Sequence, residues 1–220
     1  IIMGKITLES MKEAARDFAV KLSAKEIEEL FGVTDGKAVG TYVEHKFTDY
    51  LKSNFKNFKS GNSASGIDFP DLNVDLKVTS IRQPQSSCPF RHATQKVYGL
   101  GYHLLVFVYD KVDNPETNSA QLNIMHGIFV NKEQTADYQT TYGLNEIIRR
   151  NGNTDDIEAF LEERNLPLDD IGRRDLAQRI IQNPPQVGYL TVSNALQWRL
   201  QYGRVVSLAN QVEGVEDLLA

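Results

Sequence analysis

The stretch Gly66-Ile67-Asp68-Phe69-Pro70-Asp71-Leu72-Asn73-Val74-Asp75-Leu76-Lys77 decides how this chain is expected to fold. It predicts a short strand, a turn at 70–73 and a second strand. Strand side chains alternate between two faces, so Asp75 and Lys77 point the same way. A hairpin closed at that turn makes Asp68 and Asp75 cross-strand neighbours. Folding gains little from two carboxylates and an ammonium in one patch, but a divalent metal and a phosphate need them.

This arrangement resembles the PD-(D/E)XK nuclease superfamily, in which an acidic residue and a turn precede acid-x-Lys on the next strand. It is most similar to the branch that contains the mismatch-repair nicking enzyme MutH and several type II restriction endonucleases. That branch also carries a glutamate on the preceding helix, and Glu44 in Gly40-Thr41-Tyr42-Val43-Glu44 matches it. The segment Glu29-Leu30-Phe31-Gly32-Val33 matches a further element of the branch. Asp75 departs from the pattern, because glutamate is more usual at that position.

Two alternatives concern the same stretch. Asp71 forms the literal Pro-Asp pair with Pro70, but it falls in the turn and is expected to face solvent, so Asp68 is the preferred candidate. The second alternative is an ordinary exposed hairpin with a cross-strand salt bridge, because acid-x-Lys alone is a weak signal in a charged chain.

The resemblance covers about residues 20–110 and implies an α/β fold. The expected fold is a restriction-endonuclease-like core, a mixed sheet flanked by helices, with a mainly helical C-terminal lobe. Apolar spacing predicts a helix from Gly36 to about Asn57 that carries Glu44. The core is expected to continue with a helix at 91–100, a strand at 104–109 that is buried on both faces, and a strand at 122–130.

The C-terminal part changes in character after about residue 138. Its pattern predicts helices at 143–151, 154–164 and 169–182, a short strand at 188–192, and a helix at 194–202 capped by Ser193. We therefore expect a catalytic nuclease core at 1–137 and a helical lobe at 138–220 that carries DNA recognition, within one structural unit.

The resemblance implies catalysis with Mg²⁺. Asp68 and Asp75 supply two oxygen ligands of the type that Mg²⁺ prefers, and the Leu76 carbonyl is the implied third ligand. Lys77 is cast as a compact charge that orients the attacking water and stabilises the transition state. Glu44 either binds a second ion or positions Lys77, and the sequence does not choose between one metal ion and two.

Two segments carry side chains of the kind that read base edges. The first follows the catalytic strand and contains Arg82, Gln83, Gln85, Arg91, His92, Gln95 and Lys96. The second is the predicted C-terminal helix, where Asn194, Gln197 and Gln201 form a polar stripe beside Arg199 and Arg204. Arginine to guanine and Asn or Gln to adenine are the common major-groove pairings. The alternative for the stripe is a solvated face of an amphipathic helix.

Composition narrows the class of protein. A net charge of −5 argues against bulk coating of nucleic acid, but not against a locally basic cleft. Cys88 is the single cysteine, which with the lack of a recognisable signal peptide points to the cytoplasm. No run of eighteen apolar residues is present, so no membrane span is expected. The chain has neither a P-loop signature nor a zinc-type spacing of histidines and cysteines.

Together these features predict a Mg²⁺-dependent type II restriction endonuclease. Its expected partner is double-stranded DNA, with a second copy of the chain as a further candidate partner. Two rival interpretations stay open at this point: a MutH-like nicking enzyme of DNA repair, and a non-catalytic DNA-binding protein on the same fold.

Overall fold

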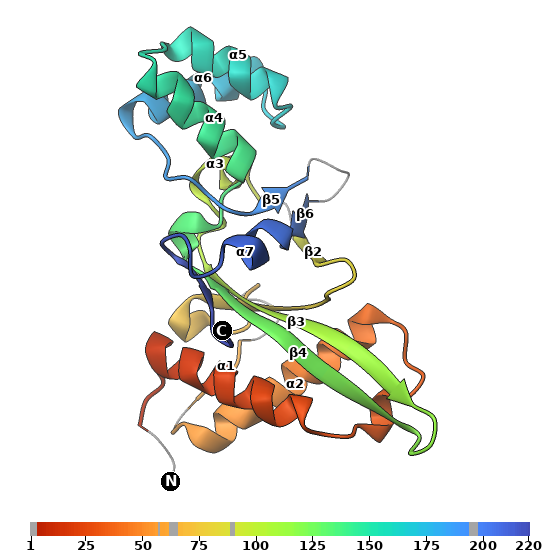
Figure 1. The fold of residues 1–220 in the computed structure, drawn as a ribbon. Helices are drawn as coiled ribbons and strands as arrows, with labels where there is room; N and C mark the ends of the chain where they lie inside the picture. Colours follow the sequence, from red (N-terminus) through yellow and green to blue (C-terminus); the bar gives the residue numbers. More distant parts are fainter. Residues whose placement is uncertain (1–3, 57, 62–65, 89–90, 194–197) are drawn as a thin grey trace. The chain divides into compact units, whose positions relative to one another are not determined.

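The computed structural model describes residues 4–56, 58–61, 66–88, 91–193 and 198–220 (Figure 1). The chain divides into two compact units. Unit 1 comprises Ile1–Gln85, His103–Val130 and Leu208–Ala220, and unit 2 comprises Ser86–Tyr102 and Asn131–Ser207. This division differs from the expected boundary after residue 137, because the chain leaves unit 1 and returns to it twice. Within the described part of the chain, no helix is long and apolar enough to cross a membrane.

A mixed four-stranded sheet forms the centre of unit 1. Its strands follow the order β1 (Val74–Ser80), β3 (His103–Asn114), β4 (Ser119–Val130) and β7 (Val215–Asp217). β1 pairs with β3 in parallel, and the other pairs are antiparallel. The β3 residues from Leu104 to Tyr109 are all buried, as expected for a central strand covered on both faces. The predicted α/β class with a mixed sheet is confirmed.

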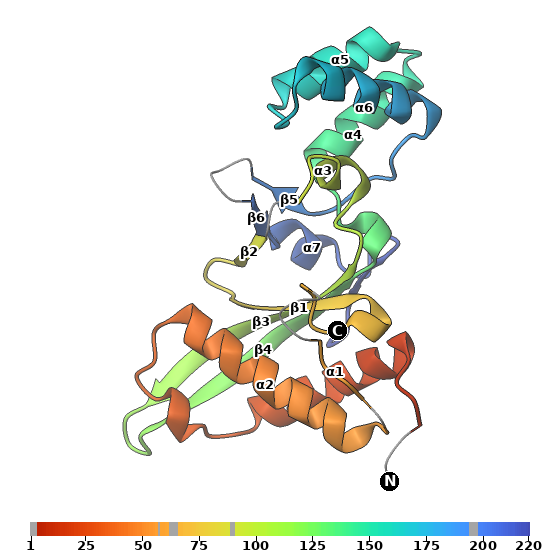
Figure 2. The ribbon, with the colours of Figure 1, turned by 180° about the vertical axis from the view of Figure 1, so that it is seen from behind.

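Helices α1 (Leu8–Ser23) and α2 (Gly36–Asn54) lie along this sheet, as Figures 1 and 2 show from opposite sides. α2 begins where the Asp35 side chain accepts a hydrogen bond from the Lys37 N–H, at 3.0 Å. The buried face of α2 packs against the sheet through aromatic side chains. The ring centroids of Phe47 and Phe107 are 5.4 Å apart, in an edge-to-face arrangement. This packing fixes the face of α2 that carries Glu44 relative to β1.

The predicted hairpin is only half formed. The segment before the turn makes a single antiparallel bridge, Phe69 to Val74, and the turn itself is a short 3-10 helix, Pro70–Leu72. Asn73 ends this turn in the left-handed conformation with φ 55°, which asparagine tolerates better than most residues. The expectation of a short strand before the turn is therefore wrong, but the expected register holds, because this bridge places residue 68 opposite residue 75.

The helix expected at 91–100 is much shorter in the structure, where α3 spans Gln95–Tyr98. Two features end it early. Gly99 and Gly101 both have positive φ values, 91° and 90°, which do not continue a helix. Before the N-terminal end of α3, the backbone N–H groups of Arg91 and His92 donate weak hydrogen bonds of 3.4 Å to the Gln95 side-chain oxygen. The prediction of a ten-residue helix is therefore wrong.

Unit 2 contains a helical cluster and a small sheet. Helices α4 (Tyr138–Arg149), α5 (Thr154–Glu163) and α6 (Asp170–Gln182) bury Leu144, Ile157, Leu161 and Ile180 together, close to the helices that the sequence predicts. The sheet has the order β2 (Gln85–Cys88), β6 (Trp198–Gln201) and β5 (Thr191–Val192). A short helix, α7 (Gly203–Leu208), follows β6.

The helix predicted at 194–202 is not present in the described part of that segment. Trp198–Gln201 form a strand, β6, which pairs antiparallel with β5 through Thr191 opposite Gln201. The Ser193 N–H donates to the Arg199 carbonyl at 3.0 Å, so Ser193 does not cap a helix there. Asn194 and Gln197 lie outside the described residues. The polar stripe at i, i+3 and i+7 is therefore wrong as a helical feature, because Gln201 belongs to a strand.

Candidate active site

Asp75 and Lys77 lie two residues apart on β1 and share one face of the strand. Their register partners on β3 are Leu104 and Val106. Both partners are buried, so Asp75 and Lys77 have apolar, solvent-excluded neighbours on β3. Asp75 is 5% exposed, and its carboxylate forms an ion pair of 2.8 Å with the Lys77 ammonium. A carboxylate has about four lone-pair sites, so this ion pair leaves some of the Asp75 oxygen lone pairs for further partners such as a cation.

Asp68 joins this pair from the segment before the turn. Its Oδ2 accepts a hydrogen bond of 2.8 Å from the Leu76 N–H, which ties the residue to β1. The side chains of Asp68 and Asp75 also share a hydrogen bond. Asp71 is exposed in the 3-10 turn. The structure thus places Asp68, and not Asp71, beside Asp75.

Glu44 contributes a third carboxylate from α2. It is half-buried, and burial is the main reason why the pKa of its carboxyl is raised. The positive charge of Lys77 acts in the opposite direction on this pKa, and the negative charge of Asp75 adds to the rise. The Glu44 carboxyl is therefore near enough to Asp75 and Lys77 for their charges to act on it.

The charge balance of the site favours a bound cation. Burial, the hydrogen bond to Asp75 and the negative charge of Asp75 together raise the pKa of Asp68 to about 7, with burial as the largest cause. The Leu76 N–H opposes this shift, but only in part. Near neutral pH the two aspartates therefore hold a proton where a divalent ion could take its place.

The donor set fits Mg²⁺ rather than a metal that needs many protein ligands. Among the described residues, no three His, Cys, Asp or Glu side chains converge as a ready-made metal cluster. Mg²⁺ does not require one, because it is commonly held by one or two carboxylates and keeps several waters. Asp68 and Asp75, with the Leu76 carbonyl of the strand between them, would hold the ion, and Glu44 stands close enough to act on their charge.

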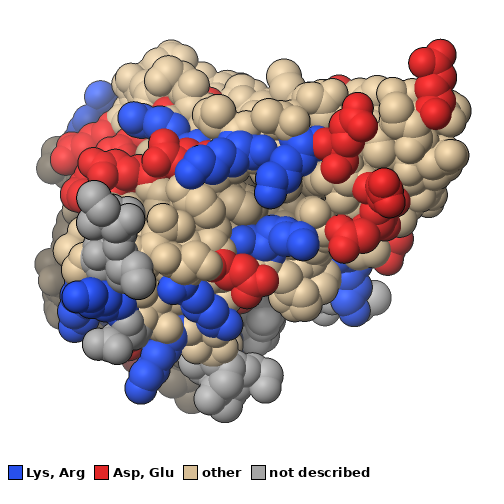
Figure 3. All heavy atoms as spheres, turned by 90° about the horizontal axis from the view of Figure 1, so that it is seen from below, with Lys and Arg blue, Asp and Glu red and all other residues tan. Residues whose placement is uncertain are grey.

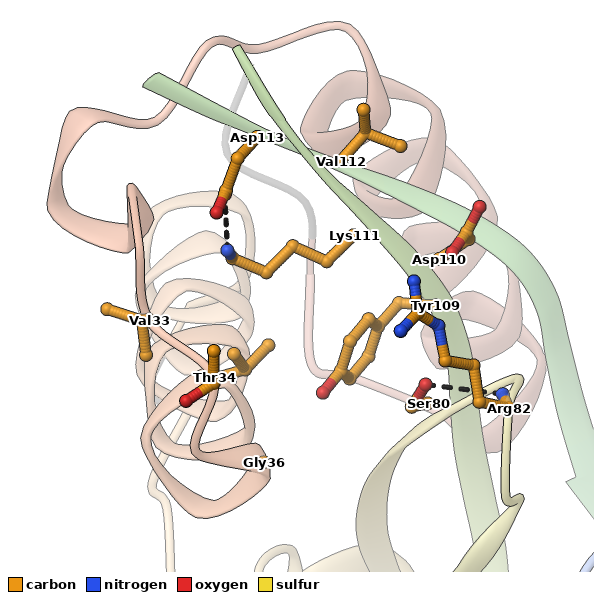
Figure 4. A pocket seen from close by; sticks show the side chains of 11 residues that line it. Val33, Thr34, Gly36, Ser80, Arg82, Tyr109, Asp110, Lys111, Val112 and Asp113 are labelled. Carbon is orange, nitrogen blue, oxygen red and sulfur yellow. Dashed lines mark hydrogen bonds and ion pairs between the residues drawn. The ribbon is translucent and has the colours of Figure 1, made fainter. Parts of the chain in front are cut away.

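The loop after β1 exposes the first two of the candidate base-reading residues. Arg82 and Gln83 are exposed, whereas Gln85 is partly buried at the start of β2. Figure 4 shows Arg82 at the rim of a hollow of about 560 Å³ in unit 1, near the Tyr109 ring. Arg82 and Gln83 are accordingly the members of this segment that are free to meet DNA from unit 1.

The candidates in unit 2 fall into two groups. Arg91, His92 and Gln201 are exposed, and Arg199 is partly exposed on β6. Arg204 packs its guanidinium 3.9 Å from the centre of the Tyr138 ring, an interaction typical of a structural cation–π contact.

Two further candidates in this segment, Gln95 and Lys96, interact with the protein itself: Lys96 is buried, and the Gln95 side chain is hydrogen-bonded to the backbone. Lys96 is 2% exposed, and burial lowers the pKa of its ammonium, although the nearby Asp137 carboxylate opposes this shift. The Gln95 side chain donates to the Leu100 carbonyl at 3.3 Å besides accepting the two N–H bonds described above. The burial of Lys96 argues against the direct DNA contact that the sequence suggested.

Basic side chains gather on the surface despite the negative net charge. Figure 3 shows Lys and Arg in a band across one face, with acidic side chains on both sides of the band. Part of the basic surface of unit 1 is a groove between α1 and α2, lined by Lys21, Lys25 and Lys46 together with Tyr42 and Tyr50. A protein with net charge −5 can therefore still present local positive potential to a polyanion.

The raised pKa of Asp68 predicts how stability depends on pH without metal. The carboxyl is protonated in the folded state and ionised in the unfolded chain between pH 3.8 and about 7. Folding takes up a proton in this window, so the free energy of unfolding falls as the pH rises through it. Asp68→Asn should abolish this dependence. At pH 8 it should add about 1–2 kcal/mol to the free energy of unfolding, after allowance for solvent screening.

Urea denaturation of the metal-free protein at pH 5 and pH 8 measures this effect. Asp71→Asn is the matched control, because Asp71 is exposed and should leave both values unchanged. If the free energy of unfolding depended on pH equally in wild type and in Asp68→Asn, the two aspartates would not share a proton at this site.

Comparison with known proteins places this chain in a family. A family model described as "Type II restriction enzyme NspV" matches residues 5–217. The type II restriction enzyme NspV of Nostoc sp. (strain ATCC 29411 / PCC 7524) is 56% identical over 213 residues, which cover 97% of this chain and 96% of that protein. No solved structure gives a significant match. The chain therefore belongs to the NspV family of type II restriction enzymes.

Proposed function

We propose that this protein is a Mg²⁺-dependent endonuclease that cleaves double-stranded DNA at a short specific sequence. The observation that supports it most strongly is the cluster of Asp68, Asp75 and Lys77 around one end of β1, in a chain whose family is that of type II restriction enzymes. A pair of carboxylates, one buried and one partly buried, beside an ammonium contributes little to stability but is suited to phosphodiester hydrolysis.

Each member of the cluster has a separate task in this proposal. Asp68 and Asp75 would hold the cation, which when bound would lower the pKa of a water ligand and neutralise phosphate charge. Lys77, held 2.8 Å from Asp75, presents a compact positive charge to the attacking water and the phosphate. Glu44, on whose carboxyl the charge of Lys77 acts, would orient the Lys77 ammonium or hold a second ion.

The proposed enzyme acts as a dimer of two copies of this chain. A double-strand break requires hydrolysis of two phosphodiesters, one on each strand, and the described part of the chain contains one cluster of this kind. A symmetric dimer would supply two such clusters and would match a symmetric recognition sequence. Sedimentation of the protein with and without its DNA tests this part of the proposal.

The restriction-enzyme interpretation is favoured over its two rivals. The family model spans both units, and so includes the part of the chain that follows the nuclease core. A non-catalytic DNA-binding protein would not need Asp68, Asp75 and Lys77 all in place. A nicking enzyme that waits for a repair partner shares the cluster, but differs in that the purified protein alone does not cut both strands.

Incubation of pure protein with plasmid DNA and Mg²⁺, followed by sequencing of the ends, separates the three. We expect linear fragments whose ends all map to one short sequence. Nicked circles alone would favour the repair enzyme, and retarded but uncut DNA would favour the non-catalytic binder. Addition of EDTA should abolish all cleavage.

Arg82 provides a test of the recognition segment. Arg82→Ala should weaken binding to the cognate sequence by about 1–3 kcal/mol, if the guanidinium reads a guanine edge. Binding to scrambled DNA should weaken far less, because it depends mainly on phosphate contacts elsewhere. Competition binding in Ca²⁺ measures both values. Arg149→Ala, on the exposed face of α4, is the control. Equal losses on both duplexes would show that Arg82 contacts only the DNA backbone.

A further inference from the structure

Thr79 stands on the same strand face as the catalytic pair. Asp75, Lys77 and Thr79 occupy every second position of β1, and their partners on β3 are Leu104, Val106 and Val108. Thr79 is only 5% exposed. A buried hydroxyl needs hydrogen-bond partners, and those of Thr79 lie in the segment that follows β1.

The Thr79 hydroxyl closes the loop between β1 and β2. It accepts a hydrogen bond from the Gln85 N–H at 3.0 Å and donates to the Gln85 carbonyl at 3.1 Å, with the Gln83 carbonyl at 3.4 Å as an alternative acceptor. The Thr79 side chain thus forms hydrogen bonds with the backbone N–H and carbonyl of Gln85, which directly follows the loop at 81–84. Without the hydroxyl, the Gln85 N–H would lose its partner, at a cost to the loop conformation.

The near side of the loop is also tied to the strands. The Ile81 N–H donates to the Tyr109 carbonyl at 2.8 Å, and the Arg82 N–H donates to the Ser80 hydroxyl at 3.2 Å. Figure 4 shows this second bond, with the Arg82 side chain turned toward the hollow beside Tyr109. The exposed side chains of Arg82 and Gln83 are therefore carried by a short loop that is fixed at both ends.

We propose that Thr79 is a positioning residue that couples sequence recognition by the 81–84 loop to catalysis at Asp75 and Lys77. This inference rests on the proposed function. Thr79 touches neither DNA nor the reacting atoms in this account. Its hydroxyl sets the distance and orientation of the Arg82 and Gln83 backbone relative to the strand that carries the cluster. Hydrogen bonds to base edges tolerate little displacement, and a misplacement of about 1 Å can cost a reaction about 100-fold.

Thr79→Val tests the proposal, because valine keeps the shape of threonine and lacks the hydroxyl. We expect kcat on the cognate sequence to fall by about 10- to 100-fold, and the preference for cognate over single-mismatch sites to shrink by about 10-fold. Thr79→Ser keeps the hydroxyl and should restore most of both values. The melting temperature of each variant is measured alongside, and kinetics are compared well below it.

The outcomes separate a positioning role from a structural one. A lower melting temperature with unchanged kcat and unchanged site preference would overturn the proposal, as would a Thr79→Ser variant no better than Thr79→Val. If Thr79→Val does not fold, Thr79→Ala, which places no methyl group against the Gln85 peptide, is measured in its place. Failure of the proposed function looks different, because wild-type protein would then not cut DNA, or Asp75→Ala would still cut it.

Discussion

Asp75→Ala is expected to reduce DNA cleavage by at least about three orders of magnitude, because it removes one metal ligand and the partner of Lys77 together. Binding of cognate DNA should remain largely intact, since phosphate and base contacts are made by other residues. Asp68→Ala should behave in the same way. Single-turnover cleavage and gel-shift binding, measured on the same preparation, give the two quantities.

Asp71→Ala is the matched control for both variants. Asp71 belongs to the same turn and carries the same charge, but it is exposed and lies outside the cluster. It should retain wild-type cleavage within about twofold, as most exposed substitutions do. Loss of cleavage in Asp71→Ala, or full cleavage in either Asp68→Ala or Asp75→Ala, would contradict the assignment of the metal ligands.

Lys77→Arg should lose most activity although the positive charge is kept. The guanidinium is larger and planar, and it spreads its charge over a fork that cannot act as a compact point donor to water. The space is restricted, since the Lys77 side chain is 22% exposed and held against the buried Asp75. We expect a fall in kcat of about 100-fold or more with little change in KM, as for an interaction that matters mainly in the transition state.

Lys77→Met separates charge from shape. It keeps the length of the lysine stem and removes the ammonium, so it should be at least as inactive as Lys77→Arg. If Lys77→Arg were as active as wild type while Lys77→Met were inactive, any nearby cation would suffice, and the role of Lys77 in placing the water would be wrong.

The cluster around β1 could be predicted because it depends on local rules. The alternation of side chains on a strand brings Asp75 and Lys77 to one face, and a four-residue turn brings Asp68 opposite Asp75. The apolar spacing of α2 likewise placed Glu44 at the edge of its buried face. Asp68, Asp75 and Lys77 lie together as predicted, even though the segment before the turn forms a single bridge instead of a strand.

The features that sequence reasoning missed depend on non-local pairing. In the segment predicted as a helix, Leu196 and Leu200 are four residues apart, which is helical spacing. Residues 198–201 nevertheless form β6, because strands β2 and β5 lie on either side of it. Lys96 looks like a surface residue in the sequence, and only the tertiary structure shows that it is buried near Asp137. Thr79 did carry a signal, since it follows Lys77 by two residues on the same strand face.

We propose that Asp68 and Asp75 hold the divalent ion used in cleavage. Diffraction at the manganese absorption edge, from crystals of the protein grown with Mn²⁺, locates bound metal directly. We predict an anomalous peak within bonding distance of the Asp68 and Asp75 carboxylates and the Leu76 carbonyl, absent from crystals of Asp75→Ala. A peak elsewhere in the chain, with none between these two aspartates, would contradict the account.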